Sequence, residues 1–302
     1  MSVLVENLTK VYGSQKAVNN ISFKAEPGSI VGFLGPNGAG KTTTMKILTT
    51  YIPQTSGVAQ VCGYDVLENP MEVARNVGYL PENNPLYPEM YVKEYLQFIA
   101  GLHKLGKSTK NRVAEMVERT GLEREQHKKI AQLSKGYKQR VGIAQAMIHN
   151  PKVLILDEPT SGLDPNQLME IRKVIKELGK EKTVILSSHI MQEVEAVCDR
   201  VMIINKGEMV ANDLTKNLQK ITSQKSYTVQ FDGKIDLKVL KNVEWVVSVE
   251  DLGDNRFTLQ SNSDKDTRKL IFDFAVSQKT AMLALEEHAS SLEEVFKKLT
   301  NK

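Results

Sequence analysis

Apolar residues in the first part of the chain follow spacings that predict strands. Residues 1–32 form β-rich runs that are separated by glycine and by a Pro-Gly pair. The continuous apolar runs VLILD at 153–157 and TVILSSH at 183–189 are typical of strands that are buried on both faces. We therefore expect a sheet whose central strands lie inside the protein.

Helical spacing separates these predicted strands. A Gly-rich turn precedes a predicted helix at 41–51, and the pattern from about 90 to 150 is helical. Another helix, which ends at Gly179, is predicted by apolar residues on one face: Leu168, Ile171, Ile175 and Leu178. Strands that alternate with helices predict an α/β fold with a parallel or mixed sheet core, here with a helical insertion.

The pattern changes near residue 220. Two runs alternate apolar with polar residues and predict strands, one with Tyr227, Val229 and Phe231 and the other with Val243, Trp245, Val247 and Val249. A predicted helix face follows at Leu270, Ile271, Phe274 and Ala275. We therefore divide the chain into a domain at 1–220 and a small α+β domain at 221–302, in which we find no catalytic cluster.

Composition supports a globular protein and limits its partners. Of the 302 residues, 41% are hydrophobic and 25% are charged, so the chain can bury a core and is not disordered. The formal net charge of +4 comes from scattered Lys and Arg, which favours a solvated surface over a nucleic-acid patch, and we expect no nucleic-acid partner. Cys62 and Cys198 lack the spacing of a metal site and are expected to be buried thiols.

No secretory signal and no membrane-spanning segment are expected. The start, MSVLVENLTK, lacks a basic segment followed by an apolar core. No apolar run approaches the ~18 residues that a spanning helix needs. We expect a cytoplasmic protein. If it works at a membrane, another chain must provide the membrane part.

The stretch GPNGAGKTT at 35–43 carries the strongest chemical signal. It follows a predicted strand, opens a predicted helix and matches the phosphate-binding pattern G-x-x-x-x-G-K-[ST]. Lys41 is expected to reach the β- and γ-phosphates of a nucleotide, and Thr42 to hold Mg²⁺. The expected nucleotide contacts are Gly35, Asn37, Gly38, Ala39, Gly40, Lys41, Thr42 and Thr43. A glycine-rich turn with a chance lysine is the alternative.

Two acids follow the buried run VLIL. A carboxylate at the end of a buried strand is costly without a partner, and a magnesium ion would provide one for Asp157. Glu158 comes next, where it could polarise a water aimed at the γ-phosphate. His189 ends the following strand and suits a γ-phosphate contact that also orients this water. The alternatives are ordinary acids at a strand end and a structural histidine.

Five motifs in a fixed order resemble those of the ATP-binding subunits of ABC transporters: GPNGAGKTT, YLPE, LSKGYKQR, VLILDEPTSGLD and LSSH. The resemblance covers residues 1 to about 215. It implies a P-loop ATPase cassette with a mixed sheet core, an antiparallel β subdomain and a helical subdomain. It also implies ATP and Mg²⁺ as cofactors. Two subunits, either two copies of this chain or one copy and a homologue, would pack head-to-tail around ATP.

The resemblance assigns three further residues by position. Tyr12 would stack on adenine, with Val18 close to it, although Tyr12 also suits a simple aromatic at a strand end. Asp164 would link the two active sites of the dimer, and it equally suits the start of a helix before Pro165.

Glu82 in YLPE departs from the family, which usually has Gln there. The family's Gln binds Mg²⁺ through its carbonyl, and a carboxylate is also a hard oxygen donor, so metal ligation is expected to survive. The expected metal ligands are therefore Thr42, Glu82 and Asp157. The added negative charge near the γ-phosphate is expected to alter the rate of hydrolysis.

The stretch LSKGYKQR at 133–140 departs from the usual family pattern LSGGQ. Lys135 replaces a Gly and Tyr137 replaces a Gln, whereas Ser134 and Gly136 are retained. The retained hydroxyl and the backbone amides at a helix start are the groups that bind phosphate. We therefore interpret the stretch as a subfamily variant whose Ser134, Lys135 and Gly136 serve the ATP held by the other subunit.

Several features resemble the ATPase subunits of ABC-2-type exporters, namely Glu82, LSKGYKQR and the segment SLEEVFKKLT at 291–300. Over its whole length the chain resembles the gliding-motility-associated ATPases of the GldA type. This resemblance implies separate transmembrane permease subunits and a peripheral position on the inner face of the cell membrane. In the stretch 83–98, apolar side chains suit contacts with such a subunit, or with the protein's own domain: Leu86, Tyr87, Met90 and Tyr91.

Three other functions fit parts of the sequence. A soluble ABC ATPase that acts on nucleic acid or ribosomes usually has two cassettes or a long coiled-coil arm, and this chain has one cassette and no sustained heptads. An import-type subunit usually keeps the Gln in place of Glu82. A binding module with impaired hydrolysis is disfavoured because Asp157, Glu158 and His189 are all present.

Overall fold

The computed structural model describes residues 1–221, 225–261, 263, 265–288 and 295–296. The chain divides into two compact units, Met1–Thr215 and Lys216–Lys302, with the division slightly before the expected position at residue 220. Each unit is described by itself. In the described part of the chain, no helix combines the length and the apolar character needed to cross a bilayer.

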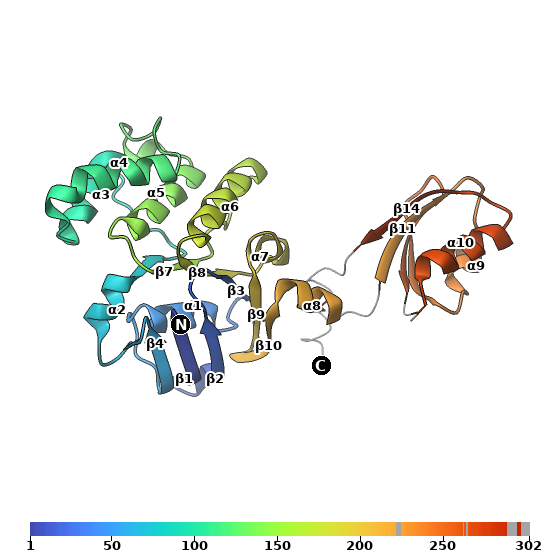
Figure 1. Cartoon of the computed structure of the whole chain (residues 1–302), viewed down its shortest axis with the longest axis horizontal. Helices are drawn as coiled ribbons and strands as arrows, with labels where there is room; N and C mark the ends of the chain where they lie inside the picture. The colour runs from blue at the N-terminus through green and yellow to red at the C-terminus, as the bar shows by residue number, and fades with distance from the viewer. Residues whose placement is uncertain (222–224, 262, 264, 289–294, 297–302) are drawn as a thin grey trace. The chain divides into compact units, whose positions relative to one another are not determined.

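A six-stranded sheet forms the centre of the first unit (Figure 1). Its order is β10 (Glu208–Leu214), β9 (Arg200–Asn205), β3 (Ile30–Leu34), β8 (Thr183–Ser188), β7 (Val153–Asp157) and β6 (Val77–Leu80). All neighbours pair in parallel except β10 and β9. Every residue of β3, β7 and β8 is buried, as the continuous apolar runs predict.

A second, antiparallel sheet packs against this core. Its order is β2 (Gln15–Ala25), β1 (Val3–Tyr12), β4 (Ser56–Val61) and β5 (Tyr64–Asp65). One hydrophobic cluster joins the two sheets, and Phe23 of β2 meets Phe33 of β3 edge to face at 5.0 Å. Helices α1 (Lys41–Leu48) and α2 (Pro70–Asn76) contribute side chains to the same cluster.

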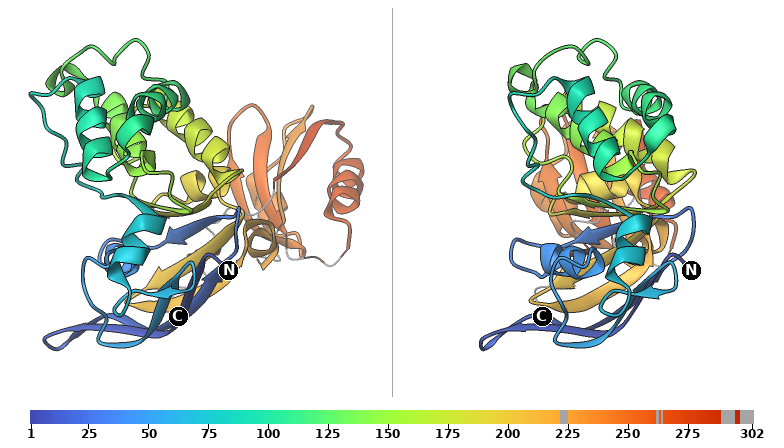
Figure 2. Two further views of the ribbon diagram at one scale, coloured as in Figure 1. Left: turned by 60° about the vertical axis from the view of Figure 1, so that its left-hand side comes forward. Right: turned by 90° about the vertical axis from the view of Figure 1, so that its left-hand side faces the viewer.

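Helices α3 (Val92–Leu102), α4 (Thr109–Arg119) and α5 (Lys135–Met147) gather on one side of the first unit (Figure 2). They are joined by the short 3₁₀ turns Gly106–Ser108 and Ile130–Gln132. Helices α6 (Pro165–Gly179), α7 (Met191–Val197) and α8 (Thr215–Ile221) follow along the chain. The predicted fold class, with its mixed sheet, antiparallel sheet and helical part, is confirmed.

After α8, the second unit has the element order β-α-β-β-α-β of a split βαβ fold. It contains β11 (Lys225–Phe231), α9 (Leu237–Lys241), β12 (Val246–Asp251), β13 (Arg256–Ser261), α10 (Thr267–Ser277) and β14 (Met282–His288). The sheet is antiparallel with the order β12-β13-β11-β14, and its core includes Tyr227, Val229 and Phe231. Apart from residues 295–296, the segment at 291–300 lies outside the described residues.

One predicted alternation in this unit is wrong. Val243, Trp245 and Val249 pack against the core, but Val247 is 45% exposed. The pairing of β12 with β13 changes register between Val246 and Ser248. Such an irregularity shifts side chains from one face of a strand to the other, so a strict two-residue period fails there.

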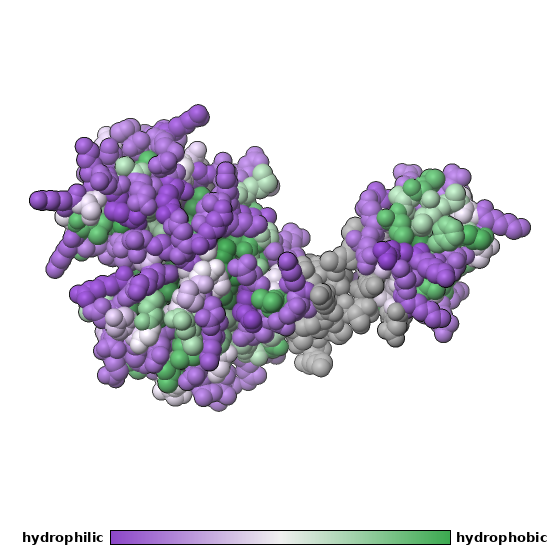
Figure 3. Space-filling model, viewed as in Figure 1, coloured by the Kyte–Doolittle hydropathy of each residue, from purple (hydrophilic) through white to green (hydrophobic). Residues whose placement is uncertain are grey.

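The surface of the first unit agrees with the modest net charge. The face seen in Figure 3 is mainly hydrophilic, and its apolar residues form small groups rather than one broad patch. Exposed large apolar side chains are also present on α3 and just before it.

Candidate active site

The loop at 35–40 joins the buried strand β3 to helix α1 and needs glycine for two separate reasons. Gly38 and Gly40 have φ angles of +79° and +107°, a region that L side chains rarely adopt. A Cβ on Gly35 would lie 2.3 Å from the carbonyl oxygen of Ile204, and a Cβ on Gly40 would lie 2.4 Å from that of Ala17. One side of the loop therefore packs tightly against the backbone of Ile204 and Ala17, and the other side faces a cleft.

A cleft of about 510 Å³ lies over this loop and over the start of α1. It is lined by these sequence-predicted residues: Tyr12, Asn37, Gly38, Ala39, Gly40, Lys41, Thr42, Thr43, Glu82, Glu158 and His189. Helix α1 begins at Lys41, and its N-cap residue is Gly40, which has no side chain that could cap the helix. An N-terminus of this kind presents backbone N–H groups and partial positive charge to an anion.

Lys41 is almost fully buried at the floor of the cleft. Its Nζ donates to the carbonyl oxygens of Gly35 at 2.8 Å and Pro36 at 3.3 Å. The same Nζ lies 3.4 Å from Oε1 of Glu158, whose side chain is also buried. A buried lysine in this position supplies positive charge to a phosphate group.

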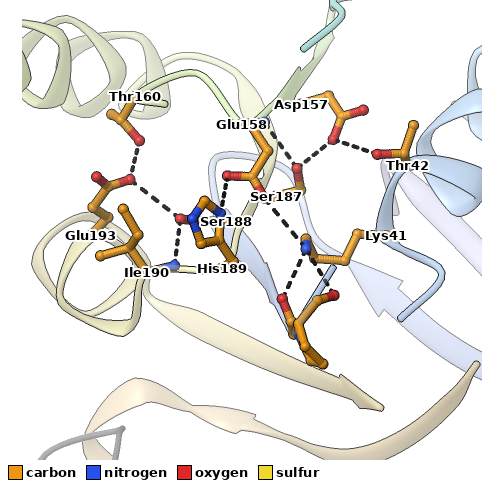
Figure 4. A network of polar contacts seen from close by, with 12 residues as sticks. Lys41, Thr42, Asp157, Glu158, Thr160, Ser187, Ser188, His189, Ile190 and Glu193 are labelled. Atoms are coloured by element: carbon orange, nitrogen blue, oxygen red, sulfur yellow. Dashed lines mark hydrogen bonds and ion pairs between the residues drawn. The ribbon is translucent and has the colours of Figure 1, made fainter. Parts of the chain in front are cut away.

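Asp157, at the carboxyl end of β7, is fully buried. Its Oδ1 accepts hydrogen bonds from Thr42 Oγ1 at 3.2 Å and from Ser187 Oγ at 2.5 Å (Figure 4). In the described part of the chain, Oδ2 has no hydrogen-bond partner, although it is buried. A buried anionic oxygen without a partner, next to a threonine hydroxyl, fits a hard cation such as Mg²⁺.

Glu158 and His189 form a hydrogen-bonded pair in the cleft (Figure 4). Nδ1 of His189 lies 2.9 Å from Oε2 of Glu158. Glu158 has a φ of +50°, and its backbone N–H donates to Ser187 Oγ at 3.0 Å. A non-glycine residue in this left-handed region stores strain, a condition that is concentrated at functional sites.

Tyr12 and Val18 lie on the neighbouring strands β1 and β2, and only Tyr12 lines the cleft. Tyr12 ends β1, is 48% exposed and lines the cleft. Val18 lies in the core, close below Gly40, and does not line the cleft. Gln15 and Ala17, which point the other way along β2, take the place that was predicted for Val18.

The signature residues lie at the start of α5 and do not line this cleft. Ser134 is the exposed N-cap of α5 and accepts the N–H of Tyr137 at 3.4 Å. A Cβ on Gly136 would lie 2.8 Å from the side chain of Gln167. Asp164 is the N-cap of α6 and accepts the N–H of Gln167 at 2.9 Å, so its predicted capping role is present.

Lys135 of the signature stretch approaches the loop that follows Glu158. Its Nζ lies 2.3 Å from the position that a Cβ would take on Gly162. Gly162 also has a φ of +68°, so a side chain is disfavoured there on two counts. The starts of α5 and α6 therefore form a second group of predicted site residues, separate from the cleft.

Comparison with known proteins decides the family. A sequence model described as ABC transporter matches residues 18–161. The bacitracin transport ATP-binding protein BcrA of Bacillus licheniformis is 41% identical over 227 residues, which cover 73% of this chain and 72% of BcrA. The chain belongs to the ABC transporter ATP-binding proteins. The uncharacterised ABC transporter ATP-binding protein YxlF of Bacillus subtilis is 33% identical over 298 residues, which cover 98% of this chain and 99% of YxlF.

A solved structure supports the same conclusion for this ABC ATP-binding protein. The dimeric ATP-binding cassette MJ0796, in a post-hydrolysis state with ADP and Pi, is 25% identical, and its TM-score is 0.65. The match covers 70% of this chain and 98% of the MJ0796 chain. The protein is therefore an ATP-binding ABC ATPase.

Some residues around the site were not found from the sequence. Gln15, Ala17 and Ser161 line the cleft, and Ser187 holds both Asp157 and the backbone of Glu158. Ser187 lies in the motif LSSH, directly before Ser188 and His189, so the motif itself indicates it. Gln15 and Ala17 carry no chemical signal, because ordinary side chains line a site only through the course of their strand.

Proposed function

We propose that this ABC ATPase is the energy-supplying subunit of an ABC-2-type exporter and that it hydrolyses ATP in the cleft above the loop at 35–43. The observation that carries the proposal is the convergence of Lys41, Glu158 and His189 on one cleft, although they follow three different strands. Tyr12 at the rim of the cleft suits stacking on the adenine ring.

Glu158 suits the role of general base. Its carboxylate faces the cleft and is hydrogen bonded to His189, so it can accept a proton from a water that attacks the γ-phosphate. Lys41 would give up its contact with Glu158 and bind phosphate oxygens instead. Thr42, Asp157 and Glu82 would hold Mg²⁺, which supplies charge neutralisation on the phosphates.

The signature residues suit a second subunit. Ser134 is exposed at the N-terminus of α5, and its helix starts beside the Asp164 cap of α6. Since these residues do not line the cleft of their own subunit, we propose that they close over the ATP of a partner in a head-to-tail dimer. The dimeric form of the related cassette MJ0796 supports this arrangement.

An aromatic surface suits a membrane partner. Tyr87 and Phe98 are 52% and 40% exposed, and their rings contact each other, while Tyr87 also meets the buried Tyr95 edge to face. Tyr91, close by in sequence, is also exposed. Exposed apolar side chains that are gathered together favour a protein contact. We propose that this surface binds the permease and that the ATPase lies on the inner face of the cell membrane.

Proteoliposomes test this assignment. The chain should hydrolyse ATP faster when it is reconstituted with a multi-span membrane protein from a neighbouring reading frame than when it is alone. The double variant Tyr87→Ala/Phe98→Ala should lose this stimulation and keep the basal rate. Stimulation by nucleic acid in place of the membrane protein would contradict the proposal and favour a soluble ATPase.

One relative and one sequence resemblance suggest which processes to test. The relative BcrA is named for bacitracin transport. The resemblance of the sequence motifs to GldA-type ATPases suggests gliding motility as a second process. We propose that this chain powers export in either case. A deletion strain that becomes sensitive to bacitracin would support drug export, whereas one that loses gliding alone would support the motility link.

A further inference from the structure

Glu193 of α7 places a buried carboxylate next to the cleft without lining it (Figure 4). The residue is only 4% exposed. Its Oε2 accepts two hydrogen bonds, one from Thr160 Oγ1 and one from Ser188 Oγ at 3.3 Å. Both partners are also buried. Burial of a carboxylate is costly, and charge-assisted hydrogen bonds offset part of that cost.

The two partners of Glu193 lie next to the proposed catalytic pair, Thr160 in the loop after β7 and Ser188 at the end of β8. Thr160 follows Glu158 by two positions, and Ser188 directly precedes His189. Ser188 Oγ also accepts the backbone N–H of Ile190 at 3.0 Å, so it holds the backbone on the far side of His189. One carboxylate oxygen thus joins the loop after β7 to the carboxyl end of β8.

We propose that Glu193 is a positioning residue that holds Glu158 and His189 in fixed positions relative to each other. This inference rests on the roles proposed for that pair. Glu158 has a left-handed backbone, which persists only where its surroundings over-determine it. Ser187 restrains the Glu158 backbone on one side through its hydrogen bond with the N–H, and the Thr160–Glu193 contact restrains the same loop on the other.

The geometry of the contact gives a matched pair of variants. Thr160 and Ser188 both donate to Oε2, while Oε1 has no partner in the described part of the chain. In Glu193→Gln, the amide oxygen can accept both hydrogen bonds, and the amide nitrogen takes the place of Oε1. In Glu193→Leu, the volume is similar but both hydrogen bonds are lost.

The full-length chain with Mg²⁺ and ATP serves for the test, with phosphate release as the measure of turnover. Glu193→Leu should lower kcat about 10- to 100-fold, because small displacements of reacting groups have effects of this size. The affinity for ATP should stay within about twofold, since Glu193 does not line the cleft. Glu193→Gln should restore most of kcat and the pH profile of the parent.

Thr160→Val and Thr160→Ser provide a second pair in case Glu193→Leu does not fold. Valine keeps the shape of threonine and removes the hydroxyl, whereas serine keeps the hydroxyl. The valine variant should lose kcat and the serine variant should keep it. The proposal is overturned if the folded leucine or valine variants keep the parental kcat, or if Glu193→Gln is as slow as Glu193→Leu.

A parallel measurement on Glu158→Gln separates this inference from the proposed function. If Glu158→Gln is inactive and the Glu193 variants are unaffected, only the positioning role fails. If Glu158→Gln hydrolyses ATP at the parental rate, the general-base assignment fails, and with it the inference that rests on it.

Discussion

The ammonium group of Lys41 lies 3.4 Å from the carboxylate of Glu158, and both side chains are less than about a tenth exposed. The proposed phosphate-binding group and the proposed base therefore neutralise each other before nucleotide arrives. When phosphate oxygens bind Lys41 in place of Glu158, the carboxylate of Glu158 keeps only His189 as its partner among these residues. Binding of ATP and preparation of the base are thus expected to be one event.

Glu158→Gln should uncouple binding from turnover. Glutamine cannot act as the base, so phosphate release should fall at least about 100-fold. The affinity for ATP should be unchanged or higher, because a negative charge that competes for Lys41 is removed. Light scattering with ATP and Mg²⁺ should then detect a stable dimer.

The matched control for this variant is Glu118→Gln. Glu118 is exposed on α4, away from the cleft, and the same change there should leave turnover and oligomeric state as in the parent. Parental turnover in Glu158→Gln would rule out the general-base role.

Lys41→Ala should abolish nucleotide binding. The change removes the buried ammonium group at the floor of the cleft and leaves Glu158 without a neutralising partner beside incoming phosphates. Titration with a fluorescent ATP analogue measures the effect. Lys110→Ala, at an exposed position on α4, controls for loss of positive charge and should bind normally. Normal binding by Lys41→Ala would contradict the phosphate-loop assignment.

The sequence predicts the sheet core and the cleft well for a physical reason. Buried parallel strands must be apolar along their whole length, so VLILD and TVILSSH are visible as continuous runs. A phosphate loop needs glycine at fixed positions, and Gly38 and Gly40 do have the left-handed backbone that this need implies. Composition and local spacing carry such requirements directly.

Other features depend on how distant strands align, and sequence spacing does not contain that information. The resemblance places Val18 near the adenine ring; in the fold Val18 is buried in the core, and its neighbour Ala17 lines the cleft. Glu193 looks like an ordinary acid on a short helix, and only the fold brings it to Thr160 and Ser188. Long-range contacts of this kind are settled by tertiary structure.

Asp157→Asn should weaken the response to Mg²⁺ more than it weakens nucleotide binding. Asparagine keeps an oxygen for the hydrogen bonds from Thr42 and Ser187 but removes the anionic charge at Oδ2. ATP affinity measured with and without Mg²⁺ should therefore differ less in the variant than in the parent. An unchanged difference would show that Asp157 does not serve the metal.

Ser134→Arg should block closure of the dimer and leave ATP binding to each subunit intact. Ser134 is exposed at the start of α5 and does not line its own cleft, so a bulky cation there obstructs only a partner. In a Glu158→Gln background, light scattering should detect monomers with ATP. Ser134→Ala is the control: it loses the N-cap at a cost of about 1 kcal/mol and adds no bulk. An ATP-stabilised dimer of the arginine variant would place the signature stretch outside the interface.

Stability should fall as the pH drops from about 6.5 towards 4, because His149 resists protonation in the folded state. Burial, together with the nearby charges of His103, Arg112 and Lys182, lowers the pKa of His149 to about 4. His103, whose ring stacks on that of His149 at 4.0 Å, also has its pKa lowered by burial. Between these pH values the unfolded chain binds more protons than the folded one, so acid favours unfolding.

His149→Gln tests this account. The amide can still donate to the carbonyl oxygen of Val77, which lies 3.0 Å from His149 Nε2, but it does not titrate. The loss in Tm between pH 7.5 and pH 5.0 should be smaller in this variant than in the parent. His127→Gln, at an exposed position, should show the parental loss. Equal losses in both variants would exclude His149 as a source of the acid sensitivity.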